Sequence, residues 1–561
     1  MKLGANDINA VKIGSTDVNK VYLGSNLVWE KSSPLLLDLY PNAAAAYSLR
    51  KLRTAYNGSA IEVRKTVATV TYIQDIGFVN GELDTAYLLS FAGSDDVFVA
   101  KWYDQSGQGN DATQSTASKQ PAIVSSGVVN ELNGKPTMTF SSPFLMDLNL
   151  SQYPFTSGGS ATEKSIFAVA ENDSTVNQNL YNIADTRDIY ALTYNRSANN
   201  TYGFLGANYG TIGGNITGQN IISSLAISPS SKTFNNTVEG VSSNLVRANF
   251  SEVTIGSRGG SYAMDGNIQE MVMYELNQSA NRAGIESNIN SNYNMYWDGS
   301  QTGLLDDYSN ASAAYSLRAL NSTYTGAAIK VRRSSDNAEQ DINLLYDGSL
   351  NTASLLSFVG SGDGFVTTWY DQSGGGNNVT QSSGSAQPQI VSSGSVVTTS
   401  GNYAIDFSGS TKTLVNATFD NSTQVSSVFT IAKSTSSAVQ IITDGANSAS
   451  RQVSGYYAGS PSVFAIYKGV TIKSTVPINT NINLLSTFFD VNSDLYLNGV
   501  QILNSVNPGS HTRQGFTLGS GINVAASFEG SIFEAIVFDG QNKSSVRLGI
   551  ESNVNTHYTI Y

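Results

Sequence analysis

The chain of 561 residues contains no cysteine and only two histidines, His511 and His557. Without cysteine there can be no disulfide, no thiolate metal site and no cysteine nucleophile. Two histidines are too few for a three-histidine zinc centre, and any histidine-dependent catalysis would need carboxylates to do most of the work. These absences exclude most thiol and zinc chemistry.

Positive charge is also scarce. The chain has 31 Lys and Arg against 43 Asp and Glu, a formal net charge of −12, and charged residues make up only 13% of it. Because a partner bound through phosphates needs clustered Lys and Arg, we expect no nucleic-acid partner. No segment approaches the roughly 18 apolar residues of a membrane span, and the amino terminus lacks the apolar core of a signal peptide. We therefore expect no membrane insertion and no export signal.

What the sequence does contain is a long tandem repeat. WYDQSG occurs at 102–107 and 369–374, and AAYSLR occurs at 45–50 and 313–318. Near the ends, GIESNINSNY (284–293) corresponds to GIESNVNTHY (549–558). A nearly constant offset of roughly 265 residues indicates two copies of one domain, and the chain is longer than one hydrophobic core usually supports. We predict domains at 34–297 and 303–561, with linkers around 30–34 and 298–303.

Most segments within each copy are short, rich in β-branched and aromatic residues, and separated by Gly, Asn and Ser, which indicates strands. Short helices are predicted at 43–53 and 84–91. A further helix is predicted at 285–293, where Ile285, Ile289 and Tyr293 share one face. The predicted fold class is all-β: two tandem sandwiches with small helical decorations, preceded by a short β-repeat.

That β-repeat occupies residues 3–29 and has a period of ten: LGANDINAVK, IGSTDVNKVY, LGSNLVW. Each unit carries Gly at its second position, and we predict three short strands joined by turns. Because domains below about 40 residues rarely fold alone, residues 1–31 should need a partner surface or sister chains to become ordered.

WYDQSG itself predicts a glycine-rich turn after a strand. Asp104 can accept hydrogen bonds from nearby backbone N–H groups, Gly107 can supply a positive φ, and Asn110 can close the turn. The second copy repeats these positions as Asp371, Gly374 and Asn377. A calcium site is the alternative, since a carboxylate beside backbone carbonyls offers hard oxygen ligands. No other cofactor is expected.

The block from AYSLR through YTGAAIKVRRSSD to WYDQSGGGNN and TQ resembles the amino-terminal half of the catalytic domain of the alpha-L-arabinofuranosidase B family. That resemblance implies a concanavalin-like jelly-roll sandwich. The closing strand EGSIFEAIVF, with the helix after it, is also similar to laminin-G and concanavalin-type lectin domains. The family hydrolyses arabinofuranosides with two carboxylates, which are about 5 to 5.5 Å apart in a retaining enzyme.

The resemblance places the family's nucleophile in the segment 181–188, where the first copy has Asp185 and the second copy has at best Asp444. It places the acid/base in 254–261 and 517–524, and neither stretch contains a carboxylate. The adjacent cysteine pair of the family is also missing. We therefore expect that the chain is not an enzyme, and that the resemblance supports the fold and sugar contact.

Tyrosines cluster in the central strands of both copies, and a tyrosine offers a sugar an apolar ring face and a hydroxyl. The alternative is that these rings belong to the sandwich core. The candidate glycan-contacting residues are Asp185, Tyr190, Tyr194, Tyr202, Tyr209, Tyr456 and Tyr457.

The phrase IGSTDVNKVYLGSNLVW resembles the short leaders of bacteriophage fibre and appendage proteins. It implies a virion structural protein, a head or tail fibre, whose residues 1–31 dock to capsid or tail proteins. The homo-oligomeric fibre would display its sandwiches on the virion surface, bind host or mucosal glycans, and leave the host cytoplasm by lysis. Two alternatives remain open: an inert capsid decoration or spacer, and an arabinofuranosidase-like glycosidase.

Overall fold

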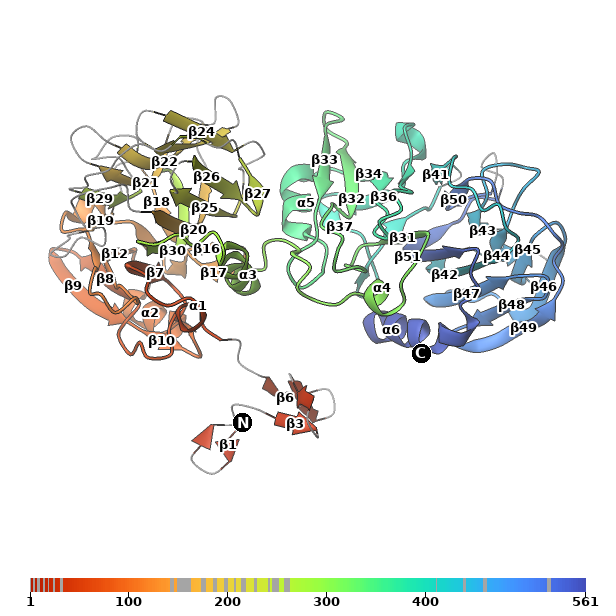
Figure 1. Ribbon diagram of the computed structural model, residues 1–561, viewed down its shortest axis with the longest axis horizontal. Coiled ribbons are helices and arrows are strands. Elements are labelled where there is room, and N and C mark those ends of the chain that lie inside the picture. The colour runs from red at the N-terminus through yellow and green to blue at the C-terminus, as the bar shows by residue number, and fades with distance from the viewer. Residues whose placement is uncertain are drawn as a thin grey trace. The chain divides into compact units, whose positions relative to one another are not determined.

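The computed structural model describes residues 34–141, 263–409, 411–436, 440–457, 462–521 and 526–561, and shorter stretches, mainly strands, within 2–30 and 146–256. The chain divides into two compact units, Met1–Tyr293 (unit 1) and Asn294–Tyr561 (unit 2) (Figure 1). Among the described residues, the helices are all too short or too polar to cross a membrane.

Unit 2 is an antiparallel β-sandwich (Figure 1). One sheet has the order β49 (Val500–Val506), β48 (Ser493–Leu497), β47 (Asn483–Phe489), β42 (Ser426–Ser434), β51 (Gly530–Asp539), β31 (Ala313–Ser316). The other has the order β46 (Thr471–Pro477), β45 (Val463–Tyr467), β44 (Val453–Tyr457), β43 (Gln440–Asp444), β50 (Phe516–Leu518), β41 (Leu414–Asn416), β35 (Val379–Thr380), β34 (Gly364–Trp369), β32 (Ile329–Arg333), β33 (Glu339–Ile342). The short strands β36 (Gln389–Ser392) and β40 (Ile405–Asp406) join the two sheets into one hydrogen-bonded network, because β36 pairs with β34 and β40, and β40 pairs with β51.

Alternation along β42 builds two apolar layers, because successive side chains of a strand point to opposite faces. Val428 and Ala432 join the cluster that contains the buried Trp369. Phe429 and Ile431 join a second cluster with the apolar face of α6 (Arg547–Tyr558). Helix α6 therefore covers the outer face of the β42 sheet.

Unit 1 repeats this arrangement. Its first sheet has the order β26 (Ser230–Asn235), β25 (Asn220–Ala226), β20 (Lys164–Asn172), β30 (Gly266–Tyr274), β7 (Ala45–Ser48). Its second sheet contains β24 (Asn208–Ile212), β23 (Asn200–Leu205), β22 (Ile189–Asn195), β21 (Gln178–Ala184), β29 (Glu252–Ile255), β19 (Met146–Leu148), β13 (Ala112–Thr113), β12 (Val97–Trp102), β8 (Ile61–Val67), β9 (Val70–Ile76). Helix α3 (Arg282–Tyr293) corresponds to α6, and its Ile285, Ile289 and Tyr293 are buried as predicted. The all-β sandwich class with small helices is confirmed.

Two local predictions differ from the structure. Residues 43–53 do not form a helix; Ala45–Ser48 form β7, in which all four residues are buried and which pairs with β30. The Ala and Leu spacing that suggested a helix was misleading, because a strand buried on both faces also has a nearly continuous run of apolar residues. The helix predicted at 84–91 is α2 (Thr85–Ala92), and the Asp84 side chain caps it by accepting a hydrogen bond from Tyr87 N.

The amino-terminal repeat forms three hairpins, not three single strands. The pairs are β1 (Lys2–Leu3) with β2 (Asn6–Asp7), β3 (Val11–Ile13) with β4 (Thr16–Val18), and β5 (Lys20–Leu23) with β6 (Asn26–Glu30). The innermost pairings leave two residues between the strands, and the sequence there is Gly-Ala or Gly-Ser, which suits a two-residue hairpin loop.

AYSLR recurs because its arginine forms a buried ion pair. Arg50 Nε lies 2.7 Å from Glu270 Oε2, and Ser48 Oγ donates to the same oxygen at 2.7 Å. In unit 2, Arg318 Nε lies 2.9 Å from Glu534 Oε2, and the Glu534 side chain is 0% exposed. Burial alone would raise the pKa of Glu534, but Arg318 and Ser316 hold it below its ordinary value.

Candidate carboxylate site

WYDQSG forms a turn saturated with hydrogen bonds. Asp104 Oδ1 accepts from Ala46 N (2.8 Å) and Ser106 N (2.9 Å), and Oδ2 accepts from Ser106 Oγ (2.7 Å) and Asn110 N (3.0 Å). Gly107 has φ 91° and Gly374 has φ 88°. In unit 2, Asp371 accepts the corresponding four hydrogen bonds from Ala314, Ser373 and Asn377. The carboxylate thus fastens the turn to β7 or β31.

The same geometry bears on cation binding. Each of the four carboxylate oxygens already accepts two hydrogen bonds from the chain itself, so a calcium ion would have to compete with them. Throughout the described part of the chain, no three His, Asp or Glu side chains gather closely enough to hold a metal ion.

A different carboxylate lies at the end of β43. Asp444 is completely buried, and Arg451 binds it from the loop that follows: Nε lies 2.9 Å from Oδ1 and Nη2 lies 2.5 Å from Oδ2. The pairing with Asp444 raises the pKa of Arg451. The Arg451 side chain remains 24% exposed, so the ion pair borders the surface through its arginine.

A second ion pair joins the end of β51 to the segment before β50. Arg513 Nη2 bonds Asp539 Oδ2, and Arg513 Nη1 donates to the carbonyls of Phe419 (3.0 Å) and Gly515 (2.6 Å). Burial raises the pKa of Asp539 even though Arg513 opposes the shift. Asp539 Oδ1 is buried and accepts no hydrogen bond from any described residue.

The two ion pairs are neighbours. Asp444 pairs with Thr517 across β43 and β50, and Arg513 Cγ lies 3.4 Å from the position that a Cβ on Gly445 would occupy. Tyr467 stands beside them: its ring centroid is 5.4 Å from Arg451 Cζ and 5.8 Å from the His511 ring. The arrangement places an arginine-bound carboxylate and a carboxyl group of raised pKa at one end of the sandwich, beside two half-buried rings.

A buried carboxyl group of raised pKa and a carboxylate fixed by an arginine offer the two groups that acid/base chemistry needs, a proton donor and a base. Glycoside hydrolysis needs a proton donor for the leaving oxygen and a second carboxylate that acts as nucleophile or base.

Several predicted residues cannot be placed in this site. Asp185 lies outside the described residues, as do residues 257–261 and 522–524 of the two stretches expected to hold the acid/base. Backbone strands include Tyr190, Tyr194, Tyr202, Tyr209, Tyr456 and Tyr457, but their side chains are likewise outside the described part.

Sequence reasoning missed Arg451, Arg513 and Asp539. A usable signal existed for Asp539, since it ends the duplicated strand EGSIFEAIVFD, whose counterpart in unit 1 ends in Glu275. Arg451 lies only seven residues after Asp444, whereas no local pattern marked Arg513, which reaches Asp539 only through the fold.

Unit 2 is thus an all-β sandwich with two neighbouring arginine–carboxylate ion pairs at one end. Residues 307–451 match the family model described as "Alpha-L-arabinofuranosidase B, catalytic". The chain is 44% identical over 70 residues to an alpha-L-arabinofuranosidase of Hypocrea jecorina, covering 12% of this chain and 14% of that one. It is 45% identical over 71 residues to alpha-L-arabinofuranosidase B of Aspergillus oryzae, again 12% and 14%. The chain thus spans about one seventh of the length of these relatives.

Solved structures give weaker likenesses. One is an arabinofuranosidase complexed with arabinofuranosyl-alpha-1,2-xylobiose (15% identity, TM-score 0.35, covering 61% of this chain and 81% of that chain). Another is domain 4 of an extracellular arabinanase from Geobacillus stearothermophilus in complex with arabinotriose (12% identity, TM-score 0.24, covering 43% and 98%).

These matches correct one expectation from the sequence. The chain was expected not to be an enzyme, because carboxylates were missing at the positions suggested by the family resemblance. The matched family is a catalytic domain of glycoside hydrolases, and its range includes Asp444 and ends at Arg451. That match overturns the non-enzyme prediction.

Proposed function

We propose that unit 2 is an arabinofuranosidase-like glycoside hydrolase in which Asp444 and Asp539 form the working carboxyl pair. The observation that carries this proposal is the catalytic-family match over residues 307–451, which includes the buried Asp444 and its arginine partner. Asp539 belongs to a strand beyond the matched range, and the fold brings its ion pair next to that of Asp444.

The two carboxyl groups have different roles in this proposal. Asp539, whose pKa is raised by burial, is the proposed proton donor to the glycosidic oxygen as the bond breaks. Asp444, bound by Arg451, is the nucleophile or the base that activates water. Arg451, Tyr467 and His511 are partly exposed, and a sugar would approach Asp444 from their side.

The test is sugar release from 4-nitrophenyl α-L-arabinofuranoside and from arabinan by the full chain and by D444N and D539N. We expect each substitution to lower kcat by about 100-fold or more, because each removes a proton-transfer or nucleophilic group. D336N is the matched control, because Asp336 forms an exposed ion pair with Arg333 and has no role in the proposed reaction. Wild-type rates in folded D444N and D539N, or no release by the wild type, would refute the proposal.

We further propose that residues 1–31 attach the chain to a bacteriophage particle, so that the units are displayed on the virion surface and bind glycans there. Three hairpins of two to five residues per strand are too small for a core of their own, which supports a docking role. Deleting residues 1–31 should abolish co-sedimentation with virions while leaving sugar release unchanged. Unchanged co-sedimentation of the shortened chain would contradict the attachment.

A further inference from the structure

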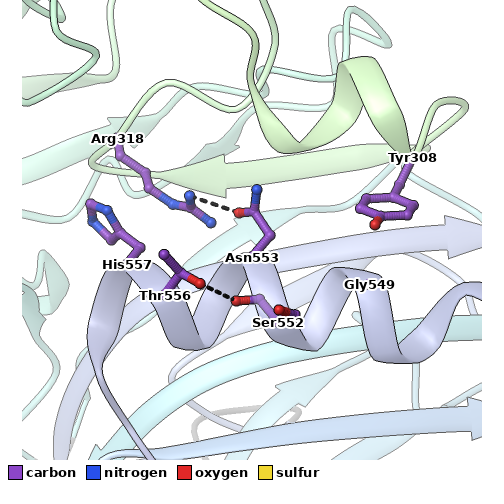
Figure 2. A pocket seen from close by; sticks show the side chains of 7 residues that line it. All are labelled: Tyr308, Arg318, Gly549, Ser552, Asn553, Thr556 and His557. Atoms are coloured by element: carbon purple, nitrogen blue, oxygen red, sulfur yellow. Dashed lines mark hydrogen bonds between the residues drawn. The ribbon is translucent and has the colours of Figure 1, made fainter. Parts of the chain in front are cut away.

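A separate pocket lies on the opposite layer of unit 2, over helix α6. It has a volume of about 490 Å³ and is lined by Tyr308, Arg318, Gly549, Ser552, Asn553, Thr556 and His557. Tyr308 follows α4 (Leu304–Asp307), and four of the other lining side chains come from α6. Figure 2 shows Tyr308 and His557 at opposite ends of the row, with Asn553 between them.

The pocket is polar, and its one strong charge is neutralised. Arg318 Nε and Nη2 donate to Glu534, and Arg318 Nη1 donates to Asn553 Oδ1 at 2.9 Å (Figure 2). Partial desolvation, together with Arg318, lowers the pKa of His557 below 6.5, so the imidazole is neutral at pH 7. Because the guanidinium is already paired, the pocket does not favour an anion.

Several hydrogen-bonding groups of the lining have no hydrogen-bond partner among the described residues. Asn553 Oδ1 is used by Arg318, but the structure gives its Nδ2 no acceptor among the described residues. The same holds for the hydroxyls of Tyr308 and Ser552 and for the His557 ring. Thr556 Oγ1, by contrast, donates to Ser552 O at 2.8 Å within the helix. Spare donors and acceptors beside an aromatic ring suit a ring-shaped ligand with several hydroxyls.

Unit 1 offers a natural comparison. There Arg50 and Asn288 take the places of Arg318 and Asn553, but Asn288 Nδ2 donates to the carbonyl of Pro34 at 3.0 Å. The position of His557 is Asn292, whose amide nitrogen is buried and unpaired. The amide nitrogen that is available on Asn553 in unit 2 is therefore already used on Asn288 in unit 1, where it binds the segment preceding α1 (Leu36–Leu39).

We propose that the pocket formed by Tyr308, Asn553 and His557 binds a neutral sugar residue of a glycan, and that the corresponding place in unit 1 does not. This binding is independent of the hydrolysis proposed at Asp444, because the pocket lies over α6, the helix on the outer face of the β42 sheet, and shares no residue with that site. A chain with both sites would hold a glycan at one place and cleave it at another.

Glycine substitutions give a matched test. Gly549 lies against the Tyr308 hydroxyl, where an added Cβ would overlap with it, and Gly284 has the same relation to Tyr40 in unit 1. G549A should therefore push Tyr308 out of place, whereas G284A makes the same change where no sugar is expected to bind. H557N, which introduces the residue found in unit 1, removes one lining group without filling space.

The experiment titrates the full chain with neutral arabino-, xylo-, manno- and galacto-oligosaccharides and with anionic 3′-sialyllactose, and follows the histidine ring signals by NMR. Only His511 and His557 contribute, and H557N assigns them. We expect a neutral oligosaccharide to shift the His557 signal in the wild type, G284A and D444N. Affinity, measured in every variant by isothermal titration calorimetry because H557N lacks the His557 signal, should be at least about tenfold weaker in G549A and H557N, the loss of one or two hydrogen bonds.

Three outcomes would overturn the proposal: no shift of the His557 signal with any neutral sugar, a shift with sialyllactose alone, or unchanged affinity in both variants. If G549A melts at a lower temperature than G284A, the affinity of H557N decides. Sugar release that persists when binding at this pocket is lost would show that the two sites are separate.

Discussion

At the scale of single residues, Asp104 and Asp371 show how one carboxylate organises a turn. Each accepts four hydrogen bonds from three other residues, and one of these donors is a backbone N–H of a strand more than fifty residues earlier in the chain. A buried backbone donor that loses its acceptor costs about 1–3 kcal/mol. The repeated phrase WYDQSG is therefore explained by stability, with no ligand required.

The first prediction follows from this count. D104A should lower the free energy of unfolding by about 2 kcal/mol or more, since several donors lose their acceptor together. Denaturation of D104A and D371A measures the effect in each unit.

Removing calcium with EDTA should leave the melting temperature of the wild type unchanged, because the carboxylate oxygens already have partners. A fall in melting temperature with EDTA that calcium restores would instead establish a cation site.

At the scale of elements, the strands and the helices α2, α3 and α6 could be predicted from the sequence. Their signals are local: a capping Asp84, four-residue spacing in Ile285 and Ile289, and short β-branched runs between glycines. The segment 43–53 could not, because its Ala-rich spacing suits a helix and only its burial beside β30 makes it a strand.

The candidate sites were less predictable than the fold, for a related reason. Asp444 was found through a family resemblance, but Arg513 and Asp539 lie 26 residues apart, on the segment before β50 and at the end of β51, and meet only in the folded sandwich. The pocket over α6 was also hidden, since Tyr308 and His557 are separated by most of unit 2 in the sequence. Side chains that converge from distant strands leave no periodic signal.

At the scale of the whole molecule, duplication provides two sandwiches with the same buried ion pair but different surroundings. Arg50–Glu270 and Arg318–Glu534 both join the AYSLR strand to the strand before the last helix, and both glutamates are 0% exposed. In unit 1 the Asn288 amide nitrogen donates to the carbonyl of Pro34, whereas the corresponding Asn553 amide has no such acceptor among the described residues of unit 2. The ion pair is common to both units, and the surroundings of its asparagine partner are what differ between them.

The final prediction uses that shared pair to ask whether the units unfold separately. E534Q leaves the buried Arg318 uncompensated, and such a loss costs about 3–5 kcal/mol, so the melting transition of unit 2 should move to lower temperature. E270Q should do the same to unit 1. Calorimetry of the full chain should then show two transitions, each variant lowering one and leaving the other in place, while D336N changes neither because its ion pair is exposed. A single transition lowered equally by E270Q and E534Q would mean that the two sandwiches fold as one cooperative body.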